Sequence, residues 1–329
     1  MTVRMHEVAE LAGVSRMTVS RALNEPDKVK EDLRNRVLDA VRSLGYVHNH
    51  LARNLSSQRS NVIGLVLPSL ENSIFAQTVK GISDYLRPRA LQLMLAEAAD
   101  DPEDEERVIG AFLAQRIGGL ILHSTLHSST ALRMLQASDI PVVETGDLPR
   151  EPVDMAVSYS NYSAAKAMTQ HLARLGYKSM ALVTLKHNPR ANERQRGFAD
   201  ALTELGLPFS RERIIEVSRG IAGGAEAISA LEERLPEVDA LFCAGDVLAI
   251  GALFEANRRG WKVPGRLAIA SFDDVELMRY VTPAMTCLRL PRYEIGRRSA
   301  EMLVARMQGA DVAVKQVDLG FEIMQRASV

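Results

Sequence analysis

Residues 5–23 read MHEVAELAGVSRMTVSRAL. The spacing of their apolar residues predicts two short helices joined by a tight turn at Gly13, with Ser15 as the N-cap of the second helix. The apolar positions expected to pack together are Val8, Ala9, Leu11 and Ala12 in the first helix and Val19, Ala22 and Leu23 in the second. Two such helices are typical of a helix-turn-helix, which places its second helix in the major groove of DNA.

The polar side chains of the second helix indicate a surface that reads DNA. The residues that apolar packing does not need are Arg16, Met17, Thr18, Ser20 and Arg21. They fall in the first turns of the helix, where a recognition helix contacts base edges. A hairpin built only for stability is the alternative, but it does not require two arginines without a nearby acid.

Residues 3–55 resemble the headpiece of the LacI/GalR family of bacterial sugar-responsive repressors. The resemblance is carried by the runs VA at 8–9, AGVS at 12–15, TVSR at 18–21 and LN at 23–24. It implies that Arg16 and Met17 discriminate between operators and that Arg21 binds a guanine through its guanidinium. Met17 departs from the polar residue common at its position and offers only apolar contact. The phosphate contacts that the resemblance implies are Ser15, Thr18, Asn24, Lys28 and Lys30, the last two preceding a third helix expected at 31–44.

A polar connector, HNHLARNLSSQR at 48–59, follows these helices. Leu51, Ala52 and Leu55 would share one helical face, but about two turns are too short to stay helical alone in water. The resemblance implies that the same segment of a second subunit covers this face. It also implies that Leu55 is wedged into the minor groove, with Asn49 and Ala52 as further DNA contacts. A flexible linker that happens to contain leucines is the alternative. Histidines at 48 and 50 replace the proline and arginine usual in the family, which predicts a looser turn into the helix.

Length and charge favour a small DNA-binding module on a larger body. The chain has 329 residues, of which 47% are hydrophobic, and its net charge is −1. Residues 1–60 contain ten Lys and Arg against seven Asp and Glu, whereas the remainder contains thirty against thirty-four. Affinity for DNA grows with the number of phosphate contacts, so this small positive excess predicts a homodimer that doubles them.

Cysteine usage and hydropathy predict a cytoplasmic protein. Cys243 and Cys287 lie in apolar surroundings, so we expect buried, reduced thiols, with a disulfide as the alternative. No run of 18 apolar residues occurs and no apolar signal region precedes the first helix, so neither secretion nor a membrane partner is expected. No cofactor or metal is expected either. The best-spaced histidines, His123 and His127, fall in a serine-rich loop, where we interpret them as surface residues.

From residue 61 onward, apolar runs of strand length alternate with amphipathic runs of helical length. Strands are expected at 62–67, 92–96, 119–122, 142–145, 155–159, 180–185, 214–217, 240–244, 267–272, 288–290 and 317–324. Helices are expected at 75–87, 103–115, 162–175, 193–205, 224–233, 247–259 and 293–307. This alternation predicts an α/β body of two parallel lobes linked by more than one crossing, with a ligand cleft at the carboxyl ends of the strands.

The predicted domains follow from this rhythm. They are a helix-turn-helix headpiece at 1–47, a hinge helix and linker at 48–60, a first lobe at 61–159 plus 289–316, and a second lobe at 160–288 plus 317–329. The body resembles the periplasmic-binding-protein-like region of the same family through runs such as IG at 63–64, GY at 176–177, GF at 197–198 and FDD at 272–274.

The resemblance implies an effector cleft in this body. Its candidate residues are Ser69, Asn72, Phe75, Arg194, Asp246, Phe272, Asp273 and Arg292. Arg194 matches the arginine that holds effector hydroxyls or a carboxylate, and Asp273 matches an acceptor of sugar hydroxyls. Core packing is the alternative role for Phe75, and helix capping is the alternative for Asp246.

Two arginines facing one cleft favour an anionic ligand. The similarity is greatest to the gluconate-utilisation repressor branch, in runs such as LPSL at 67–70, IPVVE at 140–144 and LGF at 319–321. The resemblance therefore implies a homodimeric transcriptional repressor of a carbohydrate operon. We expect it to bind palindromic operator DNA and to release it when gluconate or a related sugar acid, such as a ketogluconate, binds. Effector-strengthened DNA binding is the variant left open.

An α/β enzyme with an added helical module is the alternative from another class. The sequence contains no G-x-G-x-x-G that opens a helix, no G-x-x-x-x-G-K-[ST] phosphate loop and no G-x-S-x-G elbow. A periplasmic sugar carrier, the third class, does not need the N-terminal helices. We therefore expect no catalytic residues.

Overall fold

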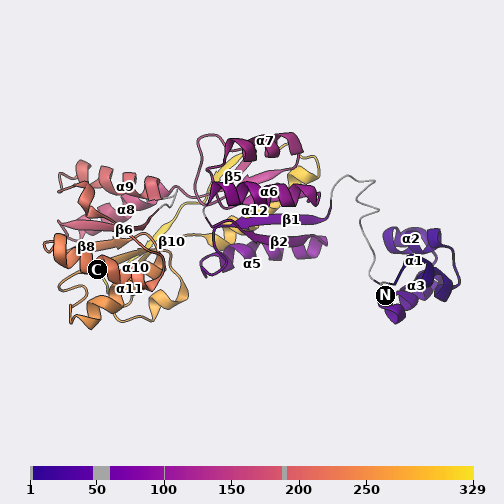
Figure 1. Cartoon of the computed structure of the whole chain (residues 1–329), viewed down its shortest axis with the longest axis horizontal. Coiled ribbons are helices and arrows are strands. Elements are labelled where there is room, and N and C mark those ends of the chain that lie inside the picture. The colour runs from indigo at the N-terminus through magenta and orange to yellow at the C-terminus, as the bar shows by residue number, and fades with distance from the viewer. Residues whose placement is uncertain (1–2, 47–59, 100, 187–190) are drawn as a thin grey trace. The chain divides into compact units, whose positions relative to one another are not determined.

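The computed structural model describes residues 3–46, 60–99, 101–186 and 191–329 (Figure 1). The chain divides into two compact units, Met1–Ser60 and Asn61–Val329. The expected hinge helix lies outside the described residues, together with its candidate DNA contacts Asn49, Ala52 and Leu55.

The N-terminal unit contains the predicted helix-turn-helix. Its helices are α1 (Met5–Ala12), α2 (Arg16–Asn24), the short 3₁₀ helix η1 (Pro26–Lys28) and α3 (Glu31–Leu44). Gly13 ends α1 in the left-handed region at φ 65°, and the Ser15 hydroxyl accepts a hydrogen bond from the Thr18 N–H at 3.1 Å. Both expected signals are therefore confirmed. The core consists of Val8, Ala9, Ala12, Val19, Ala22, Val37, Ala40 and Tyr46.

The expectation that Leu11 belongs to the core of the headpiece is wrong. Leu11 is 56% exposed, because α1 packs on α2 and α3 through the face formed by Val8, Ala9 and Ala12. Leu11 lies one residue off that face. At 3.6 residues per turn, this step carries its side chain away from the two partner helices.

The larger unit contains two six-stranded sheets, as expected for two α/β lobes. The first sheet has the order β11-β5-β4-β3-β1-β2 and is parallel throughout. Its strands are β1 (Val62–Leu67), β2 (Gln92–Glu97), β3 (Gly119–Leu122), β4 (Val142–Glu144), β5 (Met155–Ser158) and β11 (Gln316–Asp318). The second sheet has the order β12-β10-β9-β8-β6-β7, in which only β12 is antiparallel. Its strands are β6 (Met180–Leu185), β7 (Ile214–Val217), β8 (Ala240–Cys243), β9 (Ala268–Phe272), β10 (Thr286–Arg289) and β12 (Glu322–Met324).

Helices cover both faces of each sheet, which is why the central strands are apolar without alternation. In the first lobe α5 (Phe75–Leu86) and α12 (Arg292–Met307) cover one face, and α6 (Pro102–Ala114) and α7 (Ser129–Ser138) cover the other. In the second lobe α8 (Asn161–Arg174) and α9 (Ala191–Glu204) lie opposite α10 (Ile221–Arg234) and α11 (Asp246–Arg258). Short 3₁₀ helices are η2 (Arg87–Arg89), η3 (Arg211–Arg213) and η4 (Glu276–Arg279). None of the helices in the described ranges has the length and apolar content to cross a membrane.

The chain crosses between the lobes three times in its described part: from β5 to α8, from β10 to α12 and from β11 to β12. The expectation of a single last strand at 317–324 is wrong, because this part of the chain forms two short strands that belong to different sheets. Gly320, at φ 66°, turns the chain between them. The expected domain division between residues 316 and 317 falls within β11.

The two cysteines are buried and free, as expected. Cys243 and Cys287 both pair with Ser271, one from each side of β9. They are thus two strand spacings apart, roughly 9–10 Å, which is beyond the reach of a disulfide. Burial raises the pKa of both thiols.

The segment after β3 differs most from expectation. Residues 129–138 form α7, which the sequence analysis missed, and the Ser128 hydroxyl caps it by accepting from the Ala131 N–H at 3.0 Å. The interpretation of His123 and His127 as surface residues is also wrong, because both side chains are buried. The residues that surround them come from distant parts of the sequence, so the local serine-rich pattern carries no sign of their burial.

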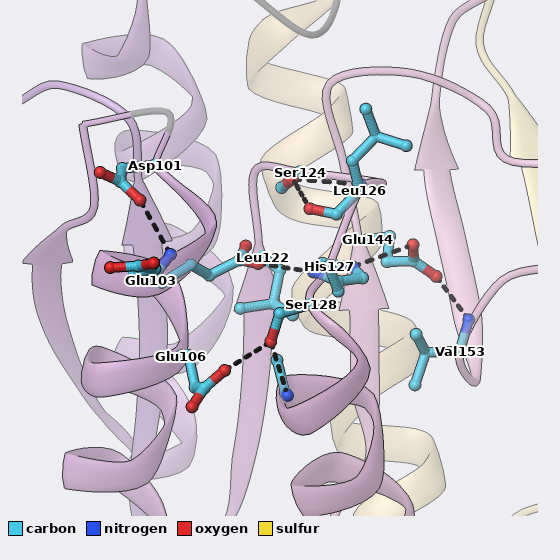
Figure 2. Close-up of polar contacts among 12 residues, drawn as sticks. Asp101, Glu103, Glu106, Leu122, Ser124, Leu126, His127, Ser128, Glu144 and Val153 are labelled. Atoms are coloured by element: carbon cyan, nitrogen blue, oxygen red, sulfur yellow. Dashed lines mark hydrogen bonds and ion pairs between the residues drawn. The ribbon is translucent and has the colours of Figure 1, made fainter.

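His127 lies between two buried carboxylates (Figure 2). Its Nδ1 lies 2.7 Å from Oε2 of Glu105 on α6, and its Nε2 lies 3.3 Å from Oε1 of Glu144 on β4. The next residue, Ser128, donates a hydrogen bond to Glu106 at 2.6 Å. These contacts tie the start of α7 to α6 and to the sheet.

Burial alone would lower the pKa of His127, but the hydrogen bonds to Glu105 and Glu144 overcome it and raise this pKa to about 9. His127 is therefore a cation at neutral pH and neutralises part of the buried negative charge. Removing one partner of a buried charge cluster leaves the other charges uncompensated, at a cost of about 3–5 kcal/mol.

We predict that the larger unit becomes less stable as the pH rises above neutral, because His127 then loses its proton. The pKa rises from 6.5 to about 9 on folding, so the stabilisation is complete below about pH 6.5 and is lost as the pH rises through 9. The expected loss is about 3 kcal/mol in the free energy of unfolding, measured by urea denaturation between pH 6.5 and 9.5. His127→Gln should be less stable at pH 6.5 and should lack this loss. If the free energy of unfolding fell equally with pH in the wild-type protein and in His127→Gln, the loss would not come from His127.

Candidate effector cleft and DNA-reading surface

A cavity of about 260 Å³ lies at the carboxyl ends of strands from both sheets. Open α/β sheets bind ligands at these ends, and the volume is close to the lower end of the range for ligand sites, about 300–1,000 Å³. Seven of the eight predicted effector residues line it: Ser69, Asn72, Phe75, Arg194, Asp246, Asp273 and Arg292. The cleft expected from the alternation of strands and helices is therefore present.

Sequence reasoning missed several lining residues, among them Glu71, His123, Tyr159, Leu185 and Arg219. His123 directly follows β3 and Tyr159 directly follows β5. A position just after a parallel strand was thus the signal that could have identified both. Arg219 carries a similar signal, since it lies two residues after the parallel strand β7.

The first-lobe wall is a loop between β1 and α5. Its turns are closed by side chains, since Ser69 Oγ accepts from the Glu71 N–H at 3.2 Å and Asn72 Oδ1 accepts from the Ile74 N–H at 3.2 Å. Phe75 begins α5, is almost fully buried, and makes an edge-to-face contact with the His123 ring at 4.8 Å between centroids. Phe75 belongs to the core and lines the cavity, so its two expected roles are compatible.

Arg194 is only 6% exposed and lies at the start of α9. Its Nε donates to Asn161 Oδ1 at 2.7 Å and its Nη1 donates to the Ala244 carbonyl at 2.6 Å. The guanidinium lies over the Phe272 ring, with 3.9 Å from Cζ to the centroid. Phe272 itself is fully buried behind Arg194 and does not line the cavity. Among the described residues, Arg194 has no carboxylate partner, and its Nη2 has no hydrogen-bond partner.

Arg292 and Asp273 form a buried ion pair. Arg292 Nε donates to Asp273 Oδ1 at 2.7 Å, and Nη2 donates to the same oxygen. Asp273 directly follows β9 and lies in the left-handed region at φ 69°. This conformation is uncommon for a residue with a side chain and is concentrated at binding sites. The second arginine of the cleft is thus already neutralised.

Asp246 is the first residue of α11, and Gly245 occupies the N-cap position. Burial, and next the negative charge of Asp273, raise the pKa of Asp246 to about 6. Its carboxyl group therefore changes charge close to physiological pH, inside the cavity.

The headpiece exposes its predicted reading face. Arg16, Met17 and Arg21 are exposed on α2, and Met17 is 71% accessible. Within the described part of the chain, neither arginine has an ion-pair partner. Two unpaired cations beside an exposed apolar side chain suit phosphates and base edges.

Most of the other predicted DNA contacts in the described headpiece have partners within it. Ser15 and Thr18 share a hydrogen bond of 2.9 Å between hydroxyls, and Asn24 Nδ2 donates to the Ser20 carbonyl at 2.8 Å. Lys28 lies 3.2 Å from Glu25, but both side chains are largely exposed. Lys30 is exposed before α3. An exposed ion pair such as Lys28–Glu25 contributes little to stability, so Lys28 can exchange Glu25 for a phosphate of DNA.

Two family models match this chain. The model of bacterial regulatory proteins of the lacI family matches residues 4–49, and the model of periplasmic binding proteins and the sugar binding domain of the LacI family matches residues 60–320. Together they cover the headpiece and nearly all of the larger unit.

Individual relatives agree over the full length. The HTH-type transcriptional regulator GntR of Escherichia coli strain K12 is 35% identical over 326 residues, which is 99% of this chain and 98% of that protein. The HTH-type transcriptional regulator GntR of Pseudomonas aeruginosa is 37% identical over 325 residues, 98% of this chain and 95% of that protein. The crystal structure of a LacI family transcriptional regulator from Silicibacter pomeroyi is 32% identical, has a TM-score of 0.92 and covers 99% of both chains.

The headpiece exposes a DNA-reading helix, the larger unit encloses a small-molecule cleft, and both parts match the same family along the whole chain. The chain therefore belongs to the LacI family of bacterial regulatory proteins, and it is a ligand-responsive DNA-binding transcriptional repressor and not an enzyme.

Proposed function

We propose that this repressor is a cytoplasmic homodimer that releases a palindromic operator when gluconate or a related sugar acid binds in its cleft. The observation that carries the choice of ligand is the state of Arg194 and Arg292, two of the three arginines that line the cleft. Arg292 is paired with Asp273, whereas Arg194 has only neutral acceptors among the described residues. A buried guanidinium without a carboxylate favours an anionic ligand.

The remaining groups of the cavity suit a polyhydroxylated chain. Ser69 and Asn72 offer a hydroxyl and an amide on the first-lobe side, and Asp246 and Asp273 offer carboxylates on the opposite side. Hydroxyls both donate and accept hydrogen bonds, so acceptors and donors on facing walls can fix a sugar acid in one orientation.

An exposed apolar patch supports the homodimer. It consists of Ile221, Phe254, Leu277 and Tyr280, each more than half exposed, which line one wide groove. Contiguous exposed apolar residues of this kind mark interaction surfaces. A second copy of the chain is the occupant that fits the function, because pairing doubles the phosphate contacts of a weakly basic headpiece.

The proposal is tested with the full-length protein and an operator duplex selected from a random library by that protein. Adding gluconate should weaken operator binding in a fluorescence anisotropy assay, and glucose should not. Release by glucose but not by any sugar acid would contradict the ligand class. Strengthened binding with gluconate would reverse the proposed direction of control.

The exposed guanidinium of Arg21 should be essential for operator binding. A bidentate contact to a base is worth about 1–3 kcal/mol, and a homodimer loses two of them. We therefore predict that Arg21→Ala weakens operator binding at least tenfold while the affinity for gluconate, measured by calorimetry, stays unchanged. Arg42→Ala, which removes an exposed arginine paired with Asp39 on α3, is the matched control. Equal losses in both variants would refute a specific role for Arg21.

The guanidinium of Arg194 should supply most of the selectivity for an acid. We predict that Arg194→Ala raises the gluconate dissociation constant at least tenfold, about 1.4 kcal/mol, in calorimetry. Arg196→Ala, which removes a nearby exposed arginine paired with Glu193, should change it less than twofold. Wild-type affinity in Arg194→Ala would disprove the anion site.

The carboxyl group of Asp246 should make gluconate binding depend on pH. Its pKa of about 6 means that it loses its negative charge as the pH falls from 7.5 to 5, while a sugar acid with a carboxyl pKa near 4 stays largely ionised. We expect the affinity to rise about tenfold over this range and the dependence to vanish in Asp246→Asn. A profile that is the same in both proteins would contradict this assignment.

A further inference from the structure

Asn161 connects Arg194, which lines the cleft, to the first lobe. It is the first residue of α8, reached directly after the chain has crossed from β5 into the second lobe. Its side chain is fully buried. Oδ1 accepts from Arg194 Nε at 2.7 Å, and Nδ2 donates to the Gly146 carbonyl at 2.7 Å. One amide thus joins a cavity-lining residue of the second lobe to a loop of the first.

Gly146 lies just after β4 and close to His123, a residue of the first lobe that lines the same cavity. Its φ is 97°, and a Cβ at this position would lie 3.0 Å from Nε2 of His123, which lines the cavity. Its N–H donates to Ser158 Oγ, at the end of β5, at 3.1 Å. Gly146 is therefore fixed to two strand ends of the first lobe and packs directly against a wall of the cavity.

A second contact holds the same crossing. The backbone N–H of Asn161 donates to Asp147 Oδ1 at 3.1 Å. The start of α8 is thus bound to residues 146 and 147 through both its side chain and its backbone. The two hydrogen bonds of the planar amide thus join Arg194 to Gly146, so that a displacement of Arg194 would be passed on to Gly146.

We propose that Asn161 is a positioning residue that couples occupancy of the cleft at Arg194 to the arrangement of the two lobes, and thereby to operator release. This inference rests on the proposed response to a sugar acid. Effectors shift a conformational equilibrium only by binding its states with different affinities. The Arg194–Asn161–Gly146 connection makes the position of Arg194 differ between those states.

The two ends of the amide can be tested separately. Asn161→Asp breaks the connection to the first lobe, because it places a second oxygen against the Gly146 carbonyl. It also gives Arg194 a carboxylate partner, so its gluconate dissociation constant is measured by calorimetry and gluconate is kept saturating. Ser163→Asp adds a carboxylate to the same first turn of α8 at an exposed position and is the matched control. Asn161→Ala removes both bonds and serves as the second variant.

The measured quantity is the ratio of the operator dissociation constants with saturating gluconate and without it, obtained with the full-length protein and the selected operator. We expect Asn161→Asp and Asn161→Ala to bind operator within threefold of wild type without gluconate. Their ratio should fall below one third of the wild-type ratio, and Ser163→Asp should keep the wild-type ratio. Thermal unfolding reports folding separately. If Asn161→Asp does not fold, Asn161→Ala decides the result.

A wild-type ratio in a folded Asn161 variant would overturn the inference and leave the proposed function intact. A purely structural role would lower the melting temperature and leave the ratio unchanged, which is the same contradiction. If gluconate and other sugar acids leave the operator affinity of the wild-type protein unchanged, the proposed function fails and this inference fails with it.

Discussion

A guanidinium removed from water must be given acceptors, and this constraint organises the cleft around Arg194. The protein meets it with an amide oxygen from Asn161, a carbonyl from Ala244 and the face of Phe272. None of these groups cancels the positive charge. The cleft therefore contains a charge that is held in place and still attractive to an anion, a combination that suits selective binding of a sugar acid.

The two sheets supply this arrangement because the chain passes between them three times within its described part. Arg292 begins α12 directly after one crossing, and its partner Asp273 directly follows β9 of the second lobe. Asn161 begins α8 directly after another crossing. At these crossings Arg292 lines the ligand cavity, and Asn161 contacts Arg194, which also lines it. A ligand that moves these residues can therefore change how the two lobes are arranged.

Local patterns predicted most of the fold, because the residue types of a strand or a helix are visible in neighbouring positions. The seven cavity-lining residues were predicted from the resemblance to the LacI family. Contacts between distant segments were not predictable in the same way. His127 was predicted to lie on the surface because its partners Glu105 and Glu144 are far from it in the sequence, on a helix and a strand of their own. These carboxylates keep its imidazole protonated. Asn161 showed no chemical signature, since its role depends on Arg194 and Gly146. The α7 helix was missed for a different reason, because its serine-rich start resembles a loop.

The central claim is that one chain links occupancy of the cleft to its hold on DNA, and thermodynamic linkage makes this reciprocal. The most direct measurement is the gluconate dissociation constant of the full-length protein, determined by calorimetry with and without saturating operator. The account predicts that operator weakens gluconate binding by the same factor by which gluconate weakens operator binding, about 5- to 150-fold. Identical gluconate affinities in the free and DNA-bound protein would contradict it.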